Sequence, residues 1–546
     1  MKILEGLKTE TVSSRIDNPI ALYSLVRSKY KDTSILESLG PVNEDTARYT
    51  IIGVIAAEKL VCRDGQTSYT DLTSNSTDDQ AEFLSVMNHW VKLGGRRETP
   101  LQLGAIGYLG YEMKSLFERY DQRLTNDTGI PDAYLVRYSL MHVTDHYAGQ
   151  AYWLLNDDEH RKAIAEFENA PCLIHAEQHF YVMGDITSDF SEDEYLEIIE
   201  RTKEYIRAGD IFQANITMRF HCRYDGDPFI LYLRMRETTP NPFFGYLDFD
   251  MPLLSTSPER FLKVSGRSIS SYPIKGTSLC QIDGIDQKEE LRNSEKNRAE
   301  NTMITDLLRN DIGRVSEQGS VNVPILCGVK KFNNLYHLES IVEGTLRPNL
   351  KMSDILQATF PGGSITGAPK IRAVDIIEEL ELTQRGPYTG MIGFFGESGY
   401  IDSNIAIRSI YFNGSNLYFH AGGGIVVDSE ARSEYEELNN KVRSISETCR
   451  EFNILKDYRA QIDVIDGKLL QLLNERFHIV KQVGAVKEQY GIPVTQSKRI
   501  DEVLDKRTKY GQELGDVPPG LIPELFTLII EFAMKEEETD SAASAN

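Results

Sequence analysis

Pro273-Ile274-Lys275-Gly276-Thr277 is the stretch of sequence around which this chain is organised. A lysine next to a glycine in a polar, turn-rich segment is by itself typical of a surface turn. Its surroundings argue for chemistry, because Ser257-Pro258-Glu259-Arg260 precedes it and an isolated His337 follows it. Residues 362–370, rich in glycine, lie further downstream. The question that the sequence raises is therefore whether Lys275 is a nucleophile.

The composition is that of a large globular protein. The chain has 546 residues, of which 41% are hydrophobic and 26% are charged, enough for more than one domain. Its net charge of −23 argues against a nucleic-acid partner, which would need basic surfaces. Its six cysteines show no CxxC spacing, which excludes the usual zinc and disulfide frameworks and suits a reducing compartment. Without a signal peptide or a membrane-length apolar run, we expect a cytoplasmic protein with no membrane partner.

The chain divides by pattern into three regions and a tail. Residues 1–175 mix strands and helices, and residues 176–452 alternate short strands with strong helices, which predicts an α+β fold. Residues 453–540 form a helical domain, and residues 541–546 are expected to be disordered. The predicted strands are 51–55, 102–111 and 211–216, and the predicted helices are 193–207, 294–310, 370–382 and 430–452.

The C-terminal region carries one long apolar stripe. Its members recur at steps of three, four and seven, as on one face of a helix: Ile462, Ile465, Leu469, Leu472, Ile479 and Val483. Pro493 ends this helix, and two shorter helices are predicted at 499–511 and 519–538. The junction with the preceding region contains no Gly/Ser linker, so one nearly continuous helix can join them.

Two acidic helices provide candidate metal ligands. Glu300 lies on one of them, while Glu434 and Glu437 share a face of the other, with Lys441 one turn further along. Carboxylates from two helices can hold Mg²⁺, which completes its coordination with water and substrate. Solvated acidic faces are the alternative. Residues 362–370 lack the GxxxxGK[ST] spacing of a nucleotide-binding loop.

These motifs together resemble the chorismate-utilising enzymes, a family that includes anthranilate, aminodeoxychorismate, isochorismate and salicylate synthases. The resemblance covers roughly residues 10–450. It is carried by AGDIFQ (208–213), SPER (257–260), RAEN (298–301), LLRNDIGRV (307–315), HLES (337–340), GGSITGAPKIRA (362–373), DSNIAIR (402–408) and GGGIV (422–426). It implies antiparallel sheets in a sandwich flanked by helices.

The resemblance also implies roles for single residues. Glu300 and Glu437, with Glu434 beside them, match the ligands of a Mg²⁺ that holds the ring carboxylate of chorismate. His337 and Ser364 line the ring. The site of the enolpyruvyl carboxylate and the other substrate contacts match Gln213, Thr366, Tyr388, Arg408, Gly422, Gly423, Gly424 and Lys441; an arginine fork suits a carboxylate. Asn297 stands where the family often has an acidic residue near the metal.

Two positions discriminate within the family. Isochorismate and salicylate synthases use a lysine at the position of Gln213 to activate water, and anthranilate synthases carry alanine at the position of Lys275. The resemblance to aminodeoxychorismate synthases implies that neutral Lys275 adds to C2 of chorismate while Glu259 protonates the departing C4 hydroxyl. Ammonia then attacks C4 and gives 4-amino-4-deoxychorismate. We expect partial desolvation and cationic neighbours to lower the pKa of Lys275.

Several alternatives and departures accompany this assignment. Ser278-Leu279-Cys280 stands where the family usually has an arginine nearby. An anthranilate synthase component is the first alternative, and a non-catalytic chorismate-binding regulator is the second. No amidotransferase motif is present, so ammonia comes from a separate glutamine amidotransferase subunit or from solution. A tryptophan pocket, inhibitory or structural, matches Ser38, Arg48, Tyr49, Pro242 and Phe243.

The C-terminal region resembles the all-helical chorismate mutases. Its cations match that family in spacing: Arg459, Arg476, Lys487 and Arg499. The resemblance implies an intertwined homodimer in which the first arginine comes from the partner chain, and a cationic cage that favours the rearrangement by preorganised charge. The departures are Gln496, Ile500, Ala533 and Glu537, the last of which must be protonated to donate to the ether oxygen. The domain could rearrange chorismate, rearrange aminodeoxychorismate, or serve only for dimerisation or sensing.

Overall fold

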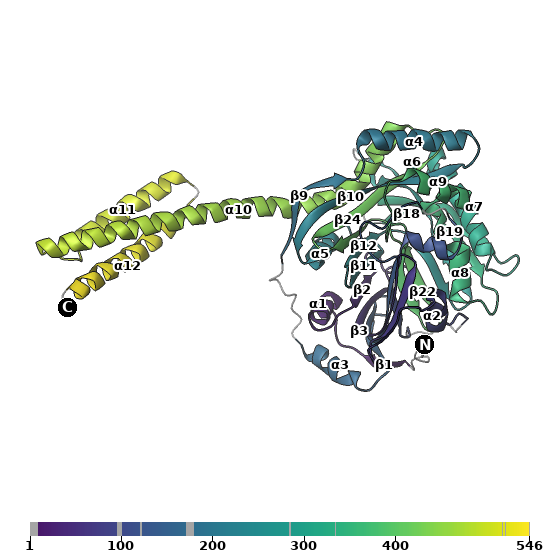
Figure 1. The fold of residues 1–546 in the computed structure, drawn as a ribbon, viewed down its shortest axis with the longest axis horizontal. Helices are drawn as coiled ribbons and strands as arrows, with labels where there is room; N and C mark the ends of the chain where they lie inside the picture. Colours follow the sequence, from purple (N-terminus) through teal and green to yellow (C-terminus); the bar gives the residue numbers. More distant parts are fainter. Residues whose placement is uncertain are drawn as a thin grey trace. The chain divides into compact units, whose positions relative to one another are not determined.

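The computed structural model describes residues 9–94, 101–120, 123–170, 179–282, 285–332, 335–515, 517–518 and 520–544. The chain forms two compact units, Met1–Asn453 and Ile454–Asn546 (Figure 1). The first unit contains all of the strands, and the second unit is helical. Each unit is considered by itself.

The strands of the first unit form one connected antiparallel network, with a separate small hairpin of β16 and β17. Their bounds are β1 (Glu10–Ser13), β2 (Thr33–Glu37), β3 (Tyr49–Arg63), β4 (Gln66–Asp71), β5 (Ser76–Asp78), β6 (Gly104–Leu109), β7 (Ala133–Asp145), β8 (Gln150–Leu155), β9 (Phe180–Ser188), β10 (Gln213–Gly226), β11 (Phe243–Asp248), β12 (Leu253–Ser257), β13 (Arg260–Ser265), β14 (Ser268–Ser271), β15 (Ile274–Leu279), β16 (Gln281–Ile282), β17 (Ile285–Asp286), β18 (Asn322–Phe332), β19 (Leu335–Thr345), β20 (Gly367–Ala368), β21 (Met391–Gly396), β22 (Ile401–Ile405), β23 (Ser409–Asn413) and β24 (Asn416–Ile425).

Helices cover this network on both sides (Figure 1). They are α1 (Pro19–Lys29), α2 (Phe83–Trp90), η1 (Tyr111–Leu116), α3 (His160–Asn169), α4 (Glu192–Arg207), α5 (Pro228–Thr238), α6 (Lys288–Asn293), α7 (Glu295–Gly313), α8 (Met352–Thr359), η2 (Gly363–Ile365), α9 (Lys370–Leu380) and the first part of α10 (Ala431–Tyr490). This antiparallel α+β architecture, with a helical C-terminal unit, confirms the predicted fold class.

Local sequence explains where the main helices begin and end. Ser191 caps α4 in a reciprocal capping box with Glu194, and Gly209 follows the helix with φ +83°. Ser294 caps α7 by accepting a hydrogen bond from the Asn297 amide. The observed bounds of both helices lie within three residues of the predicted ones.

Two large apolar clusters hold the helices against the strands. In the first, Ile199 of α4 and Ile377 of α9 pack with Ile216 of β10 and Phe419 of β24. The second joins α7 and α8 to β6, β7 and β21. Burial of this kind stabilises the folded state by about 25 cal/mol per Å² of apolar surface removed from water.

The second unit contains the rest of α10, α11 (Ser497–Leu514) and α12 (Leu521–Ser544), and α11 packs against α12. Gly491, with φ +63°, follows the end of α10 two residues before Pro493. Helix α12 ends at Ser544.

None of the helices of the described residues combines the length and the apolar character that a membrane span needs.

Candidate active site

Lys275 lies on β15 at an irregularity of its pairing with β19. Ile274 faces Glu339 and Thr277 faces His337, so the register shifts across the two residues between them. Gly276 has φ +80°, a conformation that side chains rarely adopt, and a Cβ there would approach Asn297 Cγ to 2.8 Å. Glycine at this position therefore lets the strand turn against α7 and fixes Lys275.

The Lys275 ammonium group donates a hydrogen bond to the Ser364 carbonyl oxygen over 3.0 Å. Burial lowers the pKa of Lys275, and the charge of Lys441 acts in the same direction. Glu300, Glu259 and Glu437 oppose this shift. The direction is the one predicted, and desolvation is its main cause. A lysine that loses its proton more readily is a better nucleophile.

Glu259 follows β12 and is 6% exposed. The Ser364 hydroxyl donates to its carboxylate over 2.7 Å. Burial raises the pKa of Glu259 to about 7, although the Ser364 hydrogen bond and Lys275 lower it. A carboxyl group with this pKa can be protonated near neutral pH and can act as a general acid.

His337 lies on β19 and is 4% exposed. Its Nδ1 pairs with the Thr277 hydroxyl at 2.9 Å, while its buried Nε2 has no hydrogen-bond partner among the described residues. Burial lowers the pKa of His337 to about 4, helped by Arg408 and Lys330, so the ring is neutral at pH 7. A buried unsatisfied nitrogen is costly and indicates a ligand.

Arg408 lies between β22 and β23 with φ +51°, held by hydrogen bonds from Thr256 to its carbonyl oxygen. Within the described part of the chain, its guanidinium forms no ion pair or hydrogen bond, and burial lowers its pKa. A desolvated arginine without a counter-charge is suited to a carboxylate ligand. Tyr388 is also buried and stacks on His420, with ring centroids 5.0 Å apart.

The glycine run of β24 brings backbone close to Gln213 of β10. A Cβ on Gly424 would overlap the Gln213 amide, and a Cβ on Gly422 would overlap the backbone of Ile216. The buried Gln213 Oε1 has no hydrogen-bond partner among the described residues. Thr366, also buried, donates to the Gly362 carbonyl oxygen. Lys441 donates to the Gly422 carbonyl oxygen over 2.8 Å and so approaches Gly423.

Three carboxylates of α7 and α10 act on one another electrostatically. Burial raises the pKa of Glu300, and the charges of Glu437 and Glu434 add to this effect. Burial also acts to raise the pKa of Glu437, but Lys441, 2.8 Å away, brings it below its ordinary value. Glu434 accepts a hydrogen bond from Ser429 over 2.7 Å.

The carboxylates are close enough to interact but do not form a closed metal cage. Within the described residues, no group of three or more acidic, histidine or cysteine side chains is clustered tightly enough to hold a metal ion. Mg²⁺ commonly takes one or two protein carboxylates and completes its shell with water and substrate. The mutually repelling pair of Glu300 and Glu437 fits such an ion.

Four of the five predicted tryptophan-pocket residues line one cavity with about 810 Å³ of empty space: Ser38, Arg48, Tyr49 and Phe243. Arg48 is 2.8 Å from Asp145, and its guanidinium lies over the Tyr49 ring. The fifth residue, Pro242, lines a neighbouring cavity. Phe243 and Arg260 line both cavities.

The predicted mutase residues of the second unit differ in their surroundings. Arg476 has a buried Nη1 without a hydrogen-bond partner among the described residues, and burial together with Arg507 lowers its pKa. Lys487 donates to the Val494 carbonyl oxygen, and Arg499 is 3.5 Å from Glu502 and largely exposed. The side chains of Arg459 and Glu537 lie outside the described residues.

A model of the chorismate binding enzyme family matches residues 42–447. The chain belongs to that family. A model of chorismate mutase type II matches residues 458–538. The protein is therefore a chorismate-utilising enzyme with a C-terminal chorismate mutase domain.

Relatives in this family include two kinds of synthase. Aminodeoxychorismate synthase component 1 of Escherichia coli (strain K12) is 34% identical over 409 residues, which are 73% of this chain and 89% of that protein. Anthranilate synthase component 1 of Lactococcus lactis is 32% identical over 453 residues, covering 80% of this chain and 98% of that protein. The crystal structure of anthranilate synthase component I from Streptococcus pneumoniae superimposes with a TM-score of 0.65 at 31% identity, covering 74% of this chain and 94% of that one.

Some contacts of the family motifs escaped the sequence analysis. The Thr277 hydroxyl is hydrogen-bonded to His337, and the Ser429 hydroxyl to Glu434. The only sequence signal for these contacts is that Thr277 and Ser429 lie beside the motifs. Arg507 lies on α11, and its guanidinium is 5.8 Å from the Phe526 ring centroid. Nothing in the sequence placed its charge next to Arg476.

Proposed function

We propose that the first unit is a Mg²⁺-dependent aminodeoxychorismate synthase that converts chorismate and ammonia to 4-amino-4-deoxychorismate. The arrangement of Lys275, Ser364 and Glu259 carries this proposal. It combines a lysine of lowered pKa with a carboxyl group of pKa about 7, and Ser364 contacts both of them. A nucleophile and an acid so arranged suit a displacement through a covalent intermediate.

The neutral amine of Lys275 forms a bond to C2 of chorismate, and both conjugated ring double bonds shift by one position as the C4 hydroxyl departs. Protonated Glu259 gives its proton to that hydroxyl, which leaves as water. Ammonia then forms a bond to C4, both ring double bonds shift back, and the bond between C2 and Lys275 breaks with its electron pair returning to the amine. The proton released by the new amine returns to Glu259.

The remaining residues would bind and orient the substrate. Arg408, desolvated and without a counter-charge in the described residues, suits the enolpyruvyl carboxylate, with Tyr388 and the Gly423 and Gly424 backbone nearby. The neutral His337 ring offers its Nε2 to the substrate. Glu300 and Glu437 would hold Mg²⁺, with Glu434 beside them. The metal supplies positive charge for the ring carboxylate when it is bound.

Anthranilate synthase is the competing assignment, since relatives of both kinds match at similar identity. Lys275 argues against this assignment. Anthranilate synthases resemble this chain but carry an alanine at the position of Lys275, and an alanine cannot form a covalent bond to the ring. The test is to incubate the protein with chorismate, Mg²⁺ and ammonium and to identify the product by mass. A product of the mass of aminodeoxychorismate supports the proposal. Fluorescent anthranilate, with loss of pyruvate, would establish the alternative. A glutamine amidotransferase subunit, added with glutamine, should replace ammonium.

We propose that the second unit rearranges chorismate or aminodeoxychorismate as a homodimer. Its long helix exposes apolar side chains, including Leu469, Leu472 and Ile479, each between 47% and 64% exposed. Apolar surface of this kind favours association with a second copy. The Nη1 of Arg476, which has no hydrogen-bond partner in the described part of this unit, suits a carboxylate of the substrate.

The two candidate substrates can be separated directly. The full-length protein is given chorismate without ammonium, or aminodeoxychorismate, and the products are separated by mass. Turnover of one substrate alone assigns the domain, and turnover of neither leaves dimerisation or sensing as its role.

We also propose that the cavity lined by Ser38, Arg48, Tyr49 and Phe243 binds tryptophan. Its walls combine aromatic rings with charges of both signs, including Asp45 and Lys263, which suits an aromatic zwitterion. Titration of the protein with tryptophan by calorimetry tests this, and a parallel synthase assay separates an inhibitory from a structural role.

A further inference from the structure

A second cavity reaches the catalytic histidine from the protein surface. We name it the inlet cavity and define it by these lining residues: Pro41, Asn43, Thr46, Pro242, Phe243, Pro258, Arg260, Tyr272, Ile274, Lys330, Lys331, Phe332, His337 and Glu339. It contains about 720 Å³ of space not filled by atoms. Pro41, Asn43 and Lys331 at its rim are exposed, whereas Pro258 and His337 are buried.

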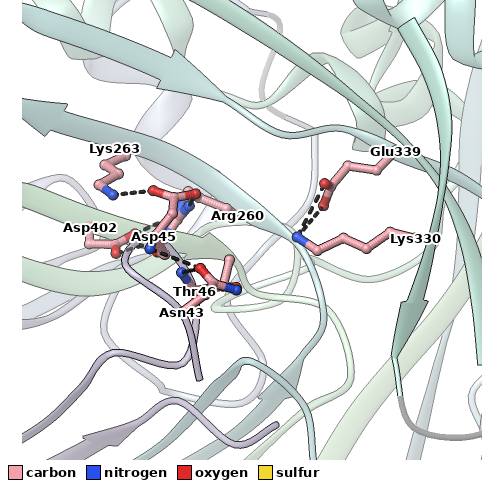
Figure 2. Close-up of polar contacts among 8 residues, drawn as sticks. All are labelled: Asn43, Asp45, Thr46, Arg260, Lys263, Lys330, Glu339 and Asp402. Atoms are coloured by element: carbon pink, nitrogen blue, oxygen red, sulfur yellow. Dashed lines mark hydrogen bonds and ion pairs between the residues drawn. The ribbon is translucent and has the colours of Figure 1, made fainter. Parts of the chain in front are cut away.

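The walls of the inlet cavity are largely apolar. Rings of Phe243, Tyr272 and Phe332 and three prolines supply most of them. The charge of Asp45 is neutralised next to this wall, because its carboxylate pairs with Lys263 and Arg260 (Figure 2). Arg260 also pairs with Asp402. A charged group set in such a wall interacts more strongly with an entering ion than the same group does in water.

One ion pair lies within the cavity itself. The Lys330 ammonium group is 3.2 Å from the Glu339 carboxylate (Figure 2). Glu339 is 12% exposed and Lys330 is 41% exposed, so the carboxylate belongs to the interior and its partner to the rim. An ammonium ion would make the same contact with Glu339 that the lysine makes.

Glu339 lies near residues to which we assign roles in the synthase reaction. It lies two residues from His337 on β19, so both side chains are on one face of the strand. It also pairs in register with Ile274, the residue before Lys275. Its charge contributes to the raised pKa of Glu259, and burial raises its own pKa. A buried carboxylate is a stronger base than an exposed one.

We propose that the inlet cavity admits the nitrogen substrate and that Glu339 binds an entering ammonium ion and accepts its proton. This inference rests on the proposed synthase function. Ammonium transfers one proton to the Glu339 carboxylate and becomes ammonia, whose lone pair forms the bond to C4. The bond between C2 and Lys275 breaks in that step, as described above. Glu339 returns its proton to solvent through the exposed rim.

Glu339→Gln tests the assignment in the full-length protein, with chorismate, Mg²⁺ and varied ammonium chloride and without any glutaminase. The variant removes the charge and keeps the shape. We expect the KM for ammonium to rise about tenfold, a loss of roughly 1.4 kcal/mol in binding, while the KM for chorismate stays unchanged. Raising the pH should narrow the difference in ammonium KM between the variant and the wild type, because more of the nitrogen is then free ammonia for both proteins. Glu343→Gln is the matched control, since Glu343 lies on the same face of β19 outside the cavity.

A second pair of variants tests the passage itself. Pro41→Trp adds bulk at the exposed rim and should lower kcat/KM for ammonium, whereas Val42→Trp, at an exposed neighbour that does not line the cavity, should not.

An unchanged ammonium KM in Glu339→Gln would overturn the inference, as would parallel changes in both KM values, which indicate a structural role. If the wild-type protein forms no aminodeoxychorismate from ammonium, the proposed function and this inference fail together. Product formation by the wild type with unaltered kinetics in the variants rejects the inference alone.

Discussion

The charged side chains of the two units have different surroundings. In the first unit, Lys275, Glu259 and Lys441 are each in contact with a polar group of the same chain. In the second unit, Arg476 and Arg507 repel each other, and apolar side chains of α10 such as Leu472 are exposed. The first arrangement is that of a site completed within one chain. The second is the arrangement for which we propose a homodimer, because a second copy would cover this apolar surface.

This contrast predicts that the two activities can be lost separately. Lys275→Ala should lower aminodeoxychorismate formation by at least about 10³-fold, the scale on which loss of a nucleophile lowers kcat. The mutase reaction of the same preparation should be unchanged, which controls for folding. Product analysis by mass gives both rates. Intact aminodeoxychorismate formation would show that the mechanism through Lys275 is wrong.

Removal of divalent metal should separate the units again. Chelation should lower the synthase rate by about 100-fold, because a Lewis acid contributes several kcal/mol and each 1.4 kcal/mol or so is a factor of ten. The mutase rate, which depends on arginine and lysine, should persist. Added Mg²⁺ should restore the synthase. A synthase that is insensitive to chelation would contradict the role given to Glu300 and Glu437.

Leu472→Glu addresses the second unit. Leu472 is 64% exposed in one chain, so the change should leave a monomer folded. In a dimer it would bury an unpaired carboxylate, and the mutase rate should fall by about tenfold or more. Ultracentrifugation should show the mass of a single chain, with the synthase rate retained.

Gln471→Glu, at the neighbouring exposed position, is the matched control for charge. A Leu472→Glu protein that remains dimeric with full mutase activity would place the interface elsewhere.

The smallest effect concerns the pH dependence of the synthase. Glu259, with a pKa of about 7, must be protonated to act, so the rate should fall as the pH rises above 7. The Ser364 hydroxyl stabilises the charged carboxylate and thus lowers this pKa. Ser364→Ala should therefore move the alkaline limb to higher pH by about one unit. A pH–rate profile of the wild type and of Ser364→Ala checks this prediction. If the alkaline limb does not move in the variant, the limb reports the titration of a group other than Glu259.

The sequence could predict those parts of the molecule that depend on local pattern. The capping residues Ser191 and Ser294 fixed where α4 and α7 begin, and the motifs supplied the side chains for which we propose catalytic roles. Contacts between distant segments depend on strand register and could not be read from spacing. Ser364 lies 105 residues from Glu259, and Lys330 meets Glu339 only because β18 and β19 pair. The repulsion between Arg507 and Arg476 likewise follows from how helices pack.

The guanidinium of Arg408, which is unpaired within the described ranges, has a further consequence for the study of this protein. Any compact anion that neutralises it binds the folded chain and not the unfolded one. Such a ligand at a hundred times its Kd raises the free energy of unfolding by about 2.7 kcal/mol. Heat denaturation can therefore serve as a label-free screen for inhibitors, in which carboxylates recognised by Arg408 raise the melting temperature and their methyl esters do not.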